Sequence, residues 1–271
     1  MYSTFKTTVL TIAGSDTYAG AGIQVDSKTI HTLKAYAFSV VTALTAQNST
    51  GVKDVYITPK KSLKMQLESI LDDVTVDAVK IGMLANADTI SVVVDAIDKY
   101  RLKNIVLDTV LISSSGKILL EKQAIDVMKK ELFPRVDLIT PNLPEVNMLL
   151  GTNYVGNSKE VEAISQSFFD LGVKAVLIKG GHSEDKNNAT DYLVEKSYLT
   201  VPYSTAKLDT THTHGTGCVL SSAIATHLAK GETLEQSVGL SKDFLYKSLH
   251  TANSLKFKYN SENETRKEPL L

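Results

Sequence analysis

The sequence predicts one α/β domain with a central, mostly parallel sheet flanked by helices. Short apolar runs alternate with longer stretches of helical periodicity, which is the pattern of βαβ units. The chain has 271 residues, 43% of them hydrophobic, so it is long enough to bury one large core. No repeat, Pro-rich linker or low-complexity tract divides it. We therefore expect a single domain over residues 1–271, with a polar, frayed tail over about 258–271.

The expected strands and helices follow one another in order along most of the chain. The strands are short, apolar and rich in β-branched residues: Thr8–Ala13, Ala37–Leu44, Ala78–Ile81, Ile105–Leu107, Asp137–Ile139 and Ala175–Ile178. The helices between and after them carry apolar residues at helical spacing: Gly22–Leu33, Lys61–Asp72, Ala87–Tyr100, Lys122–Leu132, Pro144–Leu150 and Val161–Leu171. The stretch 191–203 alternates around a turn and predicts a hairpin. Two more helices are expected over Gly217–Lys230 and Leu234–Leu255.

The loops that follow the expected strands are unusually rich in Gly, Ser, Thr, Asp and Asn. They read "GSDTYAGAG", "GML", "DTVLISSSG", "TPNLPE" and "KGGHS" after the first, third, fourth, fifth and sixth strands. Ligands of such sheets bind beyond the carboxyl ends of the strands. These loops therefore predict a binding site at that edge.

The stretch "THTHGTGC" carries the only cysteine of the chain, Cys218, just before a helical pattern. Gly215 and Gly217 permit backbone angles that turn successive amide hydrogens toward one point, and the helix start adds its positive dipole end. This arrangement predicts an anion pocket, in which the pKa of a thiol is lowered toward neutrality. The alternative is a small buried residue after an ordinary turn.

Composition and motifs exclude several function classes. Formal charge is −1 with both signs interspersed, which gives no footprint for nucleic acid or an anionic membrane. The Walker loop is missing, and Gly20–Gly22 lacks the third glycine of a dinucleotide fingerprint. A zinc site of His212, His214 and Cys218 matches no common structural spacing, and nothing nominates the third group of a Cys-His hydrolase. The start of the chain is not that of a signal peptide, so we expect a cytoplasmic protein that binds a small molecule.

Seven strings together resemble one family. "TIAGSD", "GAGIQ" followed by Asp26, "ALTAQN", "VKIGML", "TPNLPE", "IKGGH" and "THGTGC" occur in the order and approximate spacing of the hydroxymethylpyrimidine/phosphomethylpyrimidine kinases of thiamine biosynthesis. The resemblance implies a ribokinase-like three-layer sandwich and ATP-dependent phosphoryl transfer. It implies two acceptors, 4-amino-5-hydroxymethyl-2-methylpyrimidine and then its monophosphate, and it implies a homodimer.

The resemblance also assigns the acceptor side of the site. Cys218 would accept the hydroxyl proton, while the amides of Gly215, Thr216 and Gly217 stabilise charge on the transferring phosphoryl group. The residues implied to contact the pyrimidine are Gly14, Ala21, Gly22, Asp26, Gln47, Met83 and Val110. Asp26 and Gln47 would hold its polar edge. Without the resemblance, Asp26 is equally a solvated helix residue, Gln47 a polar loop residue and Met83 a core filler.

The same resemblance assigns the nucleotide side. Asn142 and Glu145 would organise Mg²⁺ and the ATP phosphates, and Asp108 would add negative charge near the metal. Lys179 and Gly180 would approach the nucleotide, and a monovalent cation is compatible with the site. Without the resemblance, Glu145 is a first-turn acid of a helix and Lys179 a solvated lysine.

One loop departs from the family. After Asp108 the family usually has Pro-Val-Met-Val-Ala-Lys-Ser-Gly, whereas residues 109–116 read Thr-Val-Leu-Ile-Ser-Ser-Ser-Gly, so Thr109 replaces the proline and Ser114 the lysine. A slower or differently gated enzyme is therefore an open expectation. The alternatives are a pyridoxal kinase, a dual-specificity enzyme, a weakly catalytic ligand-binding regulator on the same fold and, less favoured, a sugar kinase.

Overall fold

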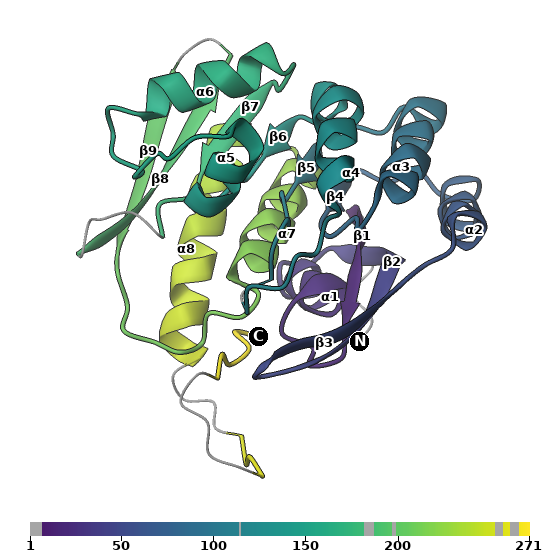
Figure 1. Ribbon diagram of the computed structural model, residues 1–271, viewed down its shortest axis with the longest axis horizontal. Coiled ribbons are helices and arrows are strands. Elements are labelled where there is room, and N and C mark those ends of the chain that lie inside the picture. The colour runs from purple at the N-terminus through teal and green to yellow at the C-terminus, as the bar shows by residue number, and fades with distance from the viewer. Residues whose placement is uncertain (1–6, 114, 182–186, 197–198, 253–256, 261–265) are drawn as a thin grey trace.

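The computed structural model describes residues 7–113, 115–181, 187–196, 199–252, 257–260 and 266–271. Within these residues one sheet of nine strands has the order β3-β2-β1-β4-β5-β6-β7-β8-β9 (Figure 1). The strands are β1 (Thr8–Asp16), β2 (Tyr36–Asn48), β3 (Gly51–Ile57), β4 (Ala78–Ile81), β5 (Ile105–Leu107), β6 (Leu138–Ile139), β7 (Ala175–Ile178), β8 (Asn188–Glu195) and β9 (Thr200–Ala206). Strands β2, β1, β4, β5, β6 and β7 are parallel neighbours, whereas β3, β8 and β9 pair antiparallel at the two edges.

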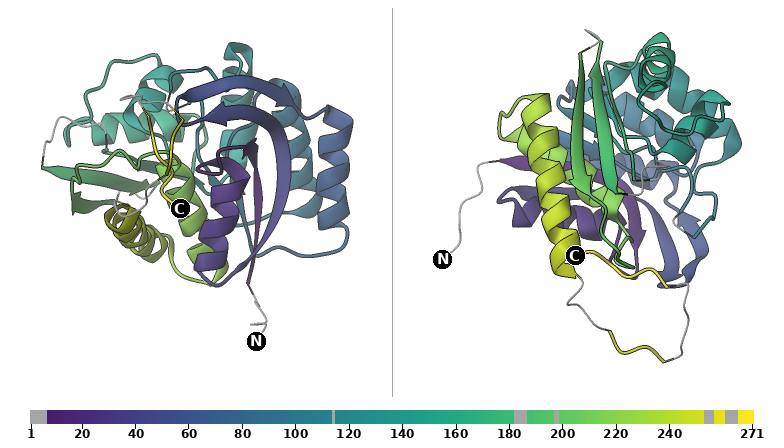
Figure 2. Two further views of the ribbon diagram at one scale, coloured as in Figure 1. Left: turned by 90° about the horizontal axis from the view of Figure 1, so that it is seen from below. Right: turned by 90° about the vertical axis from the view of Figure 1, so that its left-hand side faces the viewer.

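Helices cover both faces of the sheet, so the predicted α/β sandwich is confirmed. The helices are α1 (Gly22–Thr32), α2 (Lys60–Leu71), α3 (Ala87–Tyr100), α4 (Lys122–Val127), α5 (Leu143–Leu150), α6 (Val161–Asp170), α7 (Thr216–Ala229) and α8 (Leu234–Ala252). Helices α2 to α6 pack on one face of the sheet, and helices α1, α7 and α8 pack on the other (Figure 2).

Alternation along the buried strands explains why two helix layers form. In β5, Ile105 and Leu107 face the layer of α2 to α6, while Val106 faces the layer of α1, α7 and α8. Successive side chains of a strand point to opposite faces, so a strand that is apolar at every position requires cover on both sides.

The structure differs from the sequence prediction at three elements. The hairpin partner β3 was not predicted, and β2 continues past Leu44 to Asn48 to pair with it. The predicted helix Lys122–Leu132 is α-helical only to Val127 and continues as a π-helical turn and a 3-10 turn over Phe133–Arg135. Pro134 in that last turn has no amide hydrogen to continue an α-helix. The hairpin of β8 and β9 is confirmed, although its residues 197–198 lie outside the described ones, as do the predicted helix residues 253–255.

The prediction of a frayed tail is wrong for residues 266–271. Leu270 is 1% exposed and packs with Val25, Val219 and Ala252. His214 pairs with Pro269 through a parallel bridge. The tail looked polar because its buried residues, Pro269 and Leu270, contribute little to its composition. None of the helices in the described ranges is long and apolar enough to cross a membrane.

Candidate active site

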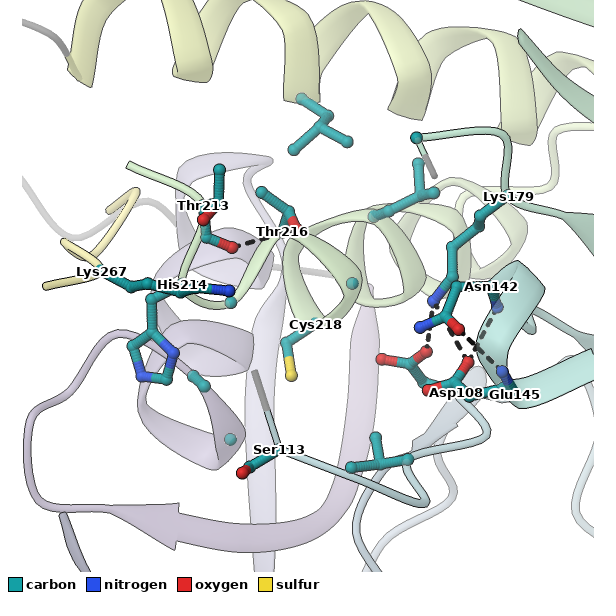
Figure 3. Close-up of a pocket in the computed structure, with 18 of the residues that line it drawn as sticks. Asp108, Ser113, Asn142, Glu145, Lys179, Thr213, His214, Thr216, Cys218 and Lys267 are labelled. Carbon is teal, nitrogen blue, oxygen red and sulfur yellow. Dashed lines mark hydrogen bonds and ion pairs between the residues drawn. The ribbon is translucent and has the colours of Figure 1, made fainter. Parts of the chain in front are cut away.

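The carboxyl ends of the parallel strands open on a cleft of about 750 Å³, at the edge that the sequence predicts. The N-terminal end of α7 forms one wall, and Cys218 points from it into the middle of the cleft (Figure 3). The predicted site residues that line the cleft are Gly14, Ala21, Gly22, Gln47, Met83, Asp108, Val110, Asn142, Glu145, Lys179, Gly215, Thr216, Gly217 and Cys218.

Glycines bring bare backbone close to its neighbours at the start of α7. Gly215 has φ of +86°, and a Cβ there would overlap the carbonyl oxygen of Gly20. A Cβ on Gly217 would lie 3.1 Å from Asp108 Oδ2 and 3.3 Å from Lys179 Nζ. The backbone of Gly217 therefore lies close to Asp108 and Lys179, and the first turn of α7 lines the cleft with its helix N-terminus.

The protonation state of Cys218 differs from the one that the sequence predicts. Burial raises the pKa of its thiol to about 11, against the opposing effect of the Lys80 ammonium. The predicted lowering of this pKa is wrong for the ligand-free site, because loss of water outweighs the nearby positive groups. Cys218 is a protonated thiol at neutral pH.

Lys179 and Asp108 form an ion pair on the side of the cleft away from β2. The distance from Lys179 Nζ to Asp108 Oδ1 is 3.0 Å, and Glu145 Oε2 lies 4.0 Å from the same nitrogen. Burial opposes the charge of Lys179, but Asp108 and Glu145 together raise its pKa. The two residues come from the ends of β7 and β5, and Figure 3 shows them converging with Asn142 and Glu145. This group presents a positive centre between two carboxylates.

Asn142 and Glu145 form a capping box at the start of α5. The Glu145 amide donates to Asn142 Oδ1 at 2.9 Å, and the Asn142 amide donates to Glu145 Oε2 at 2.8 Å. Thr109 Oγ1 also donates to Glu145 Oε2, at 3.1 Å. Burial and the nearby Asp108 raise the pKa of Glu145 to about 7, against the effect of Lys179. Glu145 is thus both the first-turn acid of a helix and a wall of the cleft.

The acidic groups suit Mg²⁺ rather than a metal held by protein alone. The described residues contain no group of three or more His, Cys, Asp or Glu side chains that could hold a metal ion. Mg²⁺ commonly takes one or two carboxylates and completes its shell with water and substrate phosphates. Asp108 and Glu145 fit this donor set, because both line the cleft beside the start of α7.

Gln47, Met83 and Val110 lie in the part of the cleft nearest β2. Met83 packs with Ala43 and Ala85, and Val110 contacts the same apolar cluster. A Cβ on Gly14 would lie 3.0 Å from Met83 Sδ, so the glycine leaves room for the methionine. This side of the cleft offers the Gln47 amide, whose side chain is hydrogen-bonded to Asp16, beside an apolar surface, which suits a flat heterocycle.

Comparison with known proteins gives the family. The sequence model described as "Phosphomethylpyrimidine kinase" matches residues 16–263. The chain belongs to the phosphomethylpyrimidine kinase family. It is 41% identical over 246 residues to the "Hydroxymethylpyrimidine/phosphomethylpyrimidine kinase" of Salmonella typhimurium, covering 91% of this chain and 92% of that one. It also matches the "Probable thiamine biosynthetic bifunctional enzyme, chloroplastic" of Oryza sativa at 40% identity, but spans only 45% of that longer protein.

Solved structures of a phosphomethylpyrimidine kinase and of a pyridoxal kinase have the same fold as this chain. The crystal structure of phosphomethylpyrimidine kinase from Clostridium difficile 630 superimposes with a TM-score of 0.79 at 39% identity, covering 90% of this chain and 99% of that one. The pyridoxal kinase of Staphylococcus aureus in complex with AMP-PCP gives a TM-score of 0.84 at 29% identity, covering 94% and 91%. The ribokinase-like α/β fold is therefore confirmed.

The structure does not bring Asp26, predicted from the family pattern, to the cleft. Its carboxylate is fully buried and receives Lys80 Nζ at 2.8 and 2.7 Å. Thr11 Oγ1 and Ser222 Oγ donate to it at 2.6 and 2.7 Å. The alternative of a solvated helix residue is wrong, and because the carboxylate does not line the cleft, its predicted contact with the pyrimidine stays a prediction. Asp26 instead joins α1 to β1, β4 and α7, partners that helical spacing alone does not reveal.

Gly180 also lies outside the cleft, although its neighbours Lys179 and Gly181 line it. Its amide donates to Asp191 Oδ1 at 2.8 Å, and a Cβ there would overlap the backbone of Thr190. Asp191 in turn pairs with Lys242 at 2.7 Å. Gly180 therefore fixes the loop after β7, and its approach to a nucleotide stays a prediction.

Asp16 and His214 are site residues that the sequence analysis missed. Asp16 Oδ2 lies 2.8 Å from His214 Nε2, and the carboxylate accepts from the amides of Tyr18, Gly20 and Ala21 at 2.7, 3.1 and 2.8 Å. Burial opposes ionisation of Asp16, but the hydrogen bonds from His214 and Gln47 lower the pKa of its carboxyl group. The pair closes the 16–21 loop onto the 211–215 loop. The Asp before "TYAG" is a turn signal that could have indicated it.

The loop over residues 109–116, whose sequence departs from the family pattern, is described except for one residue. Ser114, which stands at the family lysine, lies outside the described residues. Ile112 and Ile118 form an isolated antiparallel bridge, and Ser113 lines the cleft. Thr109, at the family proline, gains a hydroxyl that holds Glu145. The expected change in gating stays a prediction.

Loss of the Asp26 charge should destabilise the fold strongly. Asp26→Asn leaves the fully buried Lys80 ammonium without its ionic partner, and breaking a buried pair from one side costs about 3–5 kcal/mol. The matched control is Asp88→Asn, which breaks the exposed Lys60–Asp88 pair at 3.1 Å and should cost about 0–1 kcal/mol. Urea unfolding measures both free energies. Equal, small losses would show that the buried pair does not stabilise the fold.

Proposed function

We propose that this protein is a kinase that transfers the γ-phosphoryl group of ATP to the hydroxymethyl group of 4-amino-5-hydroxymethyl-2-methylpyrimidine, and then to the monophosphate so formed. One observation carries the proposal: a single cleft joins Gln47, the Cys218 thiol and the Lys179–Asp108 pair. The curated relatives are named as kinases for these two acceptors, which supports the same activity here.

The nucleotide occupies the side of the cleft that carries Lys179. The phosphates lie against the Lys179 ammonium and the amides at the start of α7, which together offset their charge. Leu208, Leu245 and Leu249 also line the cleft, and apolar side chains of this kind could cover the adenine ring. The S. aureus pyridoxal kinase bound to AMP-PCP supports nucleotide binding on this fold.

Asp108 and Glu145 would hold Mg²⁺, directly or through water. When bound, the ion neutralises phosphate charge and orients the γ-phosphoryl group. Glu145 has a raised pKa, so it must lose its proton to serve as a ligand. Asn142 and Thr109 hold its carboxylate in place through the bonds already described.

The acceptor occupies the side of the cleft that carries Gln47. The Gln47 amide donates to and accepts from the polar edge of the pyrimidine, while Met83 and Val110 pack against its apolar surface. The hydroxymethyl oxygen then lies near Cys218. The oxygen attacks the γ-phosphorus, the bond to the β-phosphate oxygen breaks, and the hydroxyl proton passes to the Cys218 sulfur once that thiol has ionised.

Phosphorylation of pyridoxal is a second candidate activity. The S. aureus pyridoxal kinase is solved in complex with pyridoxal, and it superimposes on this chain with a TM-score of 0.85 at 28% identity. Gln47 favours the aminopyrimidine, because its amide matches adjacent donor and acceptor groups on one ring edge. A noncatalytic regulator is disfavoured by the convergence of Cys218, Lys179, Asp108 and Glu145, and a sugar kinase by the apolar Met83 and Val110 surface.

A three-substrate assay tests the function. The purified protein with Mg²⁺ and ATP receives the pyrimidine alcohol, its monophosphate or pyridoxal, and formation of ADP and of each phosphorylated product is measured. We expect the highest kcat/KM with the pyrimidine alcohol and clear activity with its monophosphate. Activity with pyridoxal alone would replace the main proposal by the second. The homodimer, the cytoplasmic location and a monovalent cation stay predictions.

A further inference from the structure

Gln47 is held by the loop that follows β1. The Thr17 hydroxyl donates to Gln47 O at 2.9 Å and accepts from the Gln47 amide at 3.1 Å, so the backbone of Gln47 is fixed on both sides. Thr45 Oγ1 donates to Ser15 O at 3.0 Å and joins the end of β2 to the same loop. The Gln47 side chain is hydrogen-bonded to Asp16. Bonds within the protein therefore place this amide at the cleft before a ligand binds.

Asp16 is itself held from several sides. Its residue is 3% exposed, and its carboxylate accepts from the amides of Tyr18, Gly20 and Ala21 at 2.7, 3.1 and 2.8 Å. His214 Nε2, from the loop before α7, lies 2.8 Å from Asp16 Oδ2. A carboxylate fixed by this many donors does not rotate to follow a neighbouring side chain. The glutamine that contacts it must adapt instead.

The chemistry of this contact decides which end of the Gln47 amide faces Asp16. Burial opposes ionisation of Asp16, but its hydrogen bonds lower the pKa of the carboxyl group, so at neutral pH the group is ionised and only accepts. A glutamine amide has a donor end, the NH₂ group, and an acceptor end, the carbonyl oxygen. Two oxygens in contact would have no hydrogen between them. Nε2 of Gln47 therefore faces Asp16, which leaves Oε1 and the second N–H for a ligand.

The order of these two groups selects the edge of the ring that binds. The aminopyrimidine carries a donor, its exocyclic amine, beside an acceptor, its ring nitrogen. Oε1 of Gln47 accepts from the amine while the second N–H donates to the ring nitrogen. In the 4-oxo analogue a carbonyl replaces the amine and the ring nitrogen carries a hydrogen, so the order is reversed. A glutamine free to turn its amide over binds either ring, whereas one fixed by Asp16 binds only the first.

We propose that Asp16 is a positioning residue that fixes the direction of the Gln47 amide, and so makes the acceptor site specific for an amine-bearing ring over its oxo analogue. The inference rests on the proposed function and deepens it, because it names the group on the acceptor that the site recognises. Pyridoxal is a poorer probe of this selection, since its ring hydroxyl both donates and accepts.

The test compares kcat/KM for 4-amino-5-hydroxymethyl-2-methylpyrimidine and for its 4-oxo analogue, two rings of nearly the same shape. With the wild-type protein we expect a value at least about 100-fold higher for the amine, because the reversed order leaves polar groups facing like partners. Asp16→Asn presents an amide that both donates and accepts, so Gln47 adopts either direction. The ratio of the two values should then fall about 10-fold or more, mainly through KM. Asp16→Ser, whose hydroxyl also donates and accepts, should lower the ratio in the same way.

The matched control is Gln24→Ala. Gln24 Oε1 accepts from the Asp16 amide at 2.9 Å, and Gln24 Nε2 donates to Ser15 Oγ at 2.7 Å. Gln24 is not among the residues that line the cleft. The control thus loosens the same loop without changing the group that faces Gln47. It should keep the wild-type ratio, even where both values of kcat/KM fall together.

Other outcomes overturn the inference. Equal kcat/KM of the wild type for the two rings would do so whether or not the variants fold. A wild-type ratio in folded Asp16→Asn, checked by thermal unfolding, would show that Asp16 does not direct Gln47. An equal fall in Gln24→Ala, or loss of the folded state in both Asp16 variants, would assign Asp16 to the structure of the loop alone. A wild-type protein that phosphorylates neither ring would instead overturn the proposed function itself.

Discussion

Cys218→Ala should slow phosphorylation of the pyrimidine alcohol by about 10²–10⁴-fold, the usual contribution of a positioned acid-base group. The monophosphate attacks with an oxygen that is already anionic, so its phosphorylation should fall far less. Parallel measurement of kcat/KM for the two acceptors checks this. Equal losses would refute a base role for Cys218 and would indicate that the side chain only packs the cleft.

The pH dependence gives an independent test of the same role. Burial raises the pKa of Cys218 to about 11, so at neutral pH the thiol is mostly protonated. If the thiolate accepts the hydroxyl proton, kcat for the alcohol should rise with pH from about 7 to 10, as the ionised fraction grows. The Cys218→Ala variant should lose this rise. A flat wild-type profile over the same range would contradict the assignment.

Gly215→Ala should abolish most activity toward both acceptors. The residue has φ of +86°, and a Cβ would overlap the Gly20 carbonyl oxygen, so the 213–217 turn must move away from the 16–21 loop. Loss of one well-aimed backbone hydrogen-bond donor lowers kcat about 10²–10³-fold. A shift of this turn would displace several such backbone amides together. The expected fall in kcat is therefore at least about 10²-fold with either acceptor.

The matched control for Gly215 lies at the other end of the same helix. Gly231 has φ of +90°, but a Cβ there would meet nothing within 4 Å. Gly231→Ala should cost about 1–2 kcal/mol of stability through its backbone angle and leave kcat near the wild-type value. Both variants are compared by thermal unfolding and by kcat. If Gly215→Ala loses stability alone, with normal kcat, then the turn does not position the transferring phosphoryl group.

The sequence predicted the parallel sheet and the position of the cleft because both depend on local signals. The apolar runs around Ile12, Ile81 and Leu107 are buried in the strands where they were expected, and their loops meet at one edge. The hairpin strand β3 was missed because it lies at the sheet edge, where Lys53, Asp54 and Tyr56 are exposed and break the apolar pattern. The turn residues Asn48–Gly51 carried the missing signal.

What the sequence could not predict depends on partners distant along the chain. Asp26 meets Lys80, which lies 54 residues away, and Ser222, which lies 196 away, so its helical spacing gave no sign of burial. Burial raises the pKa of Cys218. A prediction made from the helix start alone considers only the nearby positive charge and does not include this burial. The tail packs against the fold through Pro269 and Leu270, a short apolar end to a polar stretch.

The most direct test of the account is a structure of the protein with Mg²⁺, a nonhydrolysable ATP analogue and the pyrimidine alcohol. We expect the γ-phosphate to lie against the amides of Gly215 to Cys218, with the hydroxyl oxygen about 3–3.5 Å from the γ-phosphorus and beside the Cys218 sulfur. The pyrimidine should contact Gln47, and the β- and γ-phosphates should face Lys179. A terminal phosphate bound away from the start of α7, or a pyrimidine outside this cleft, would contradict the account.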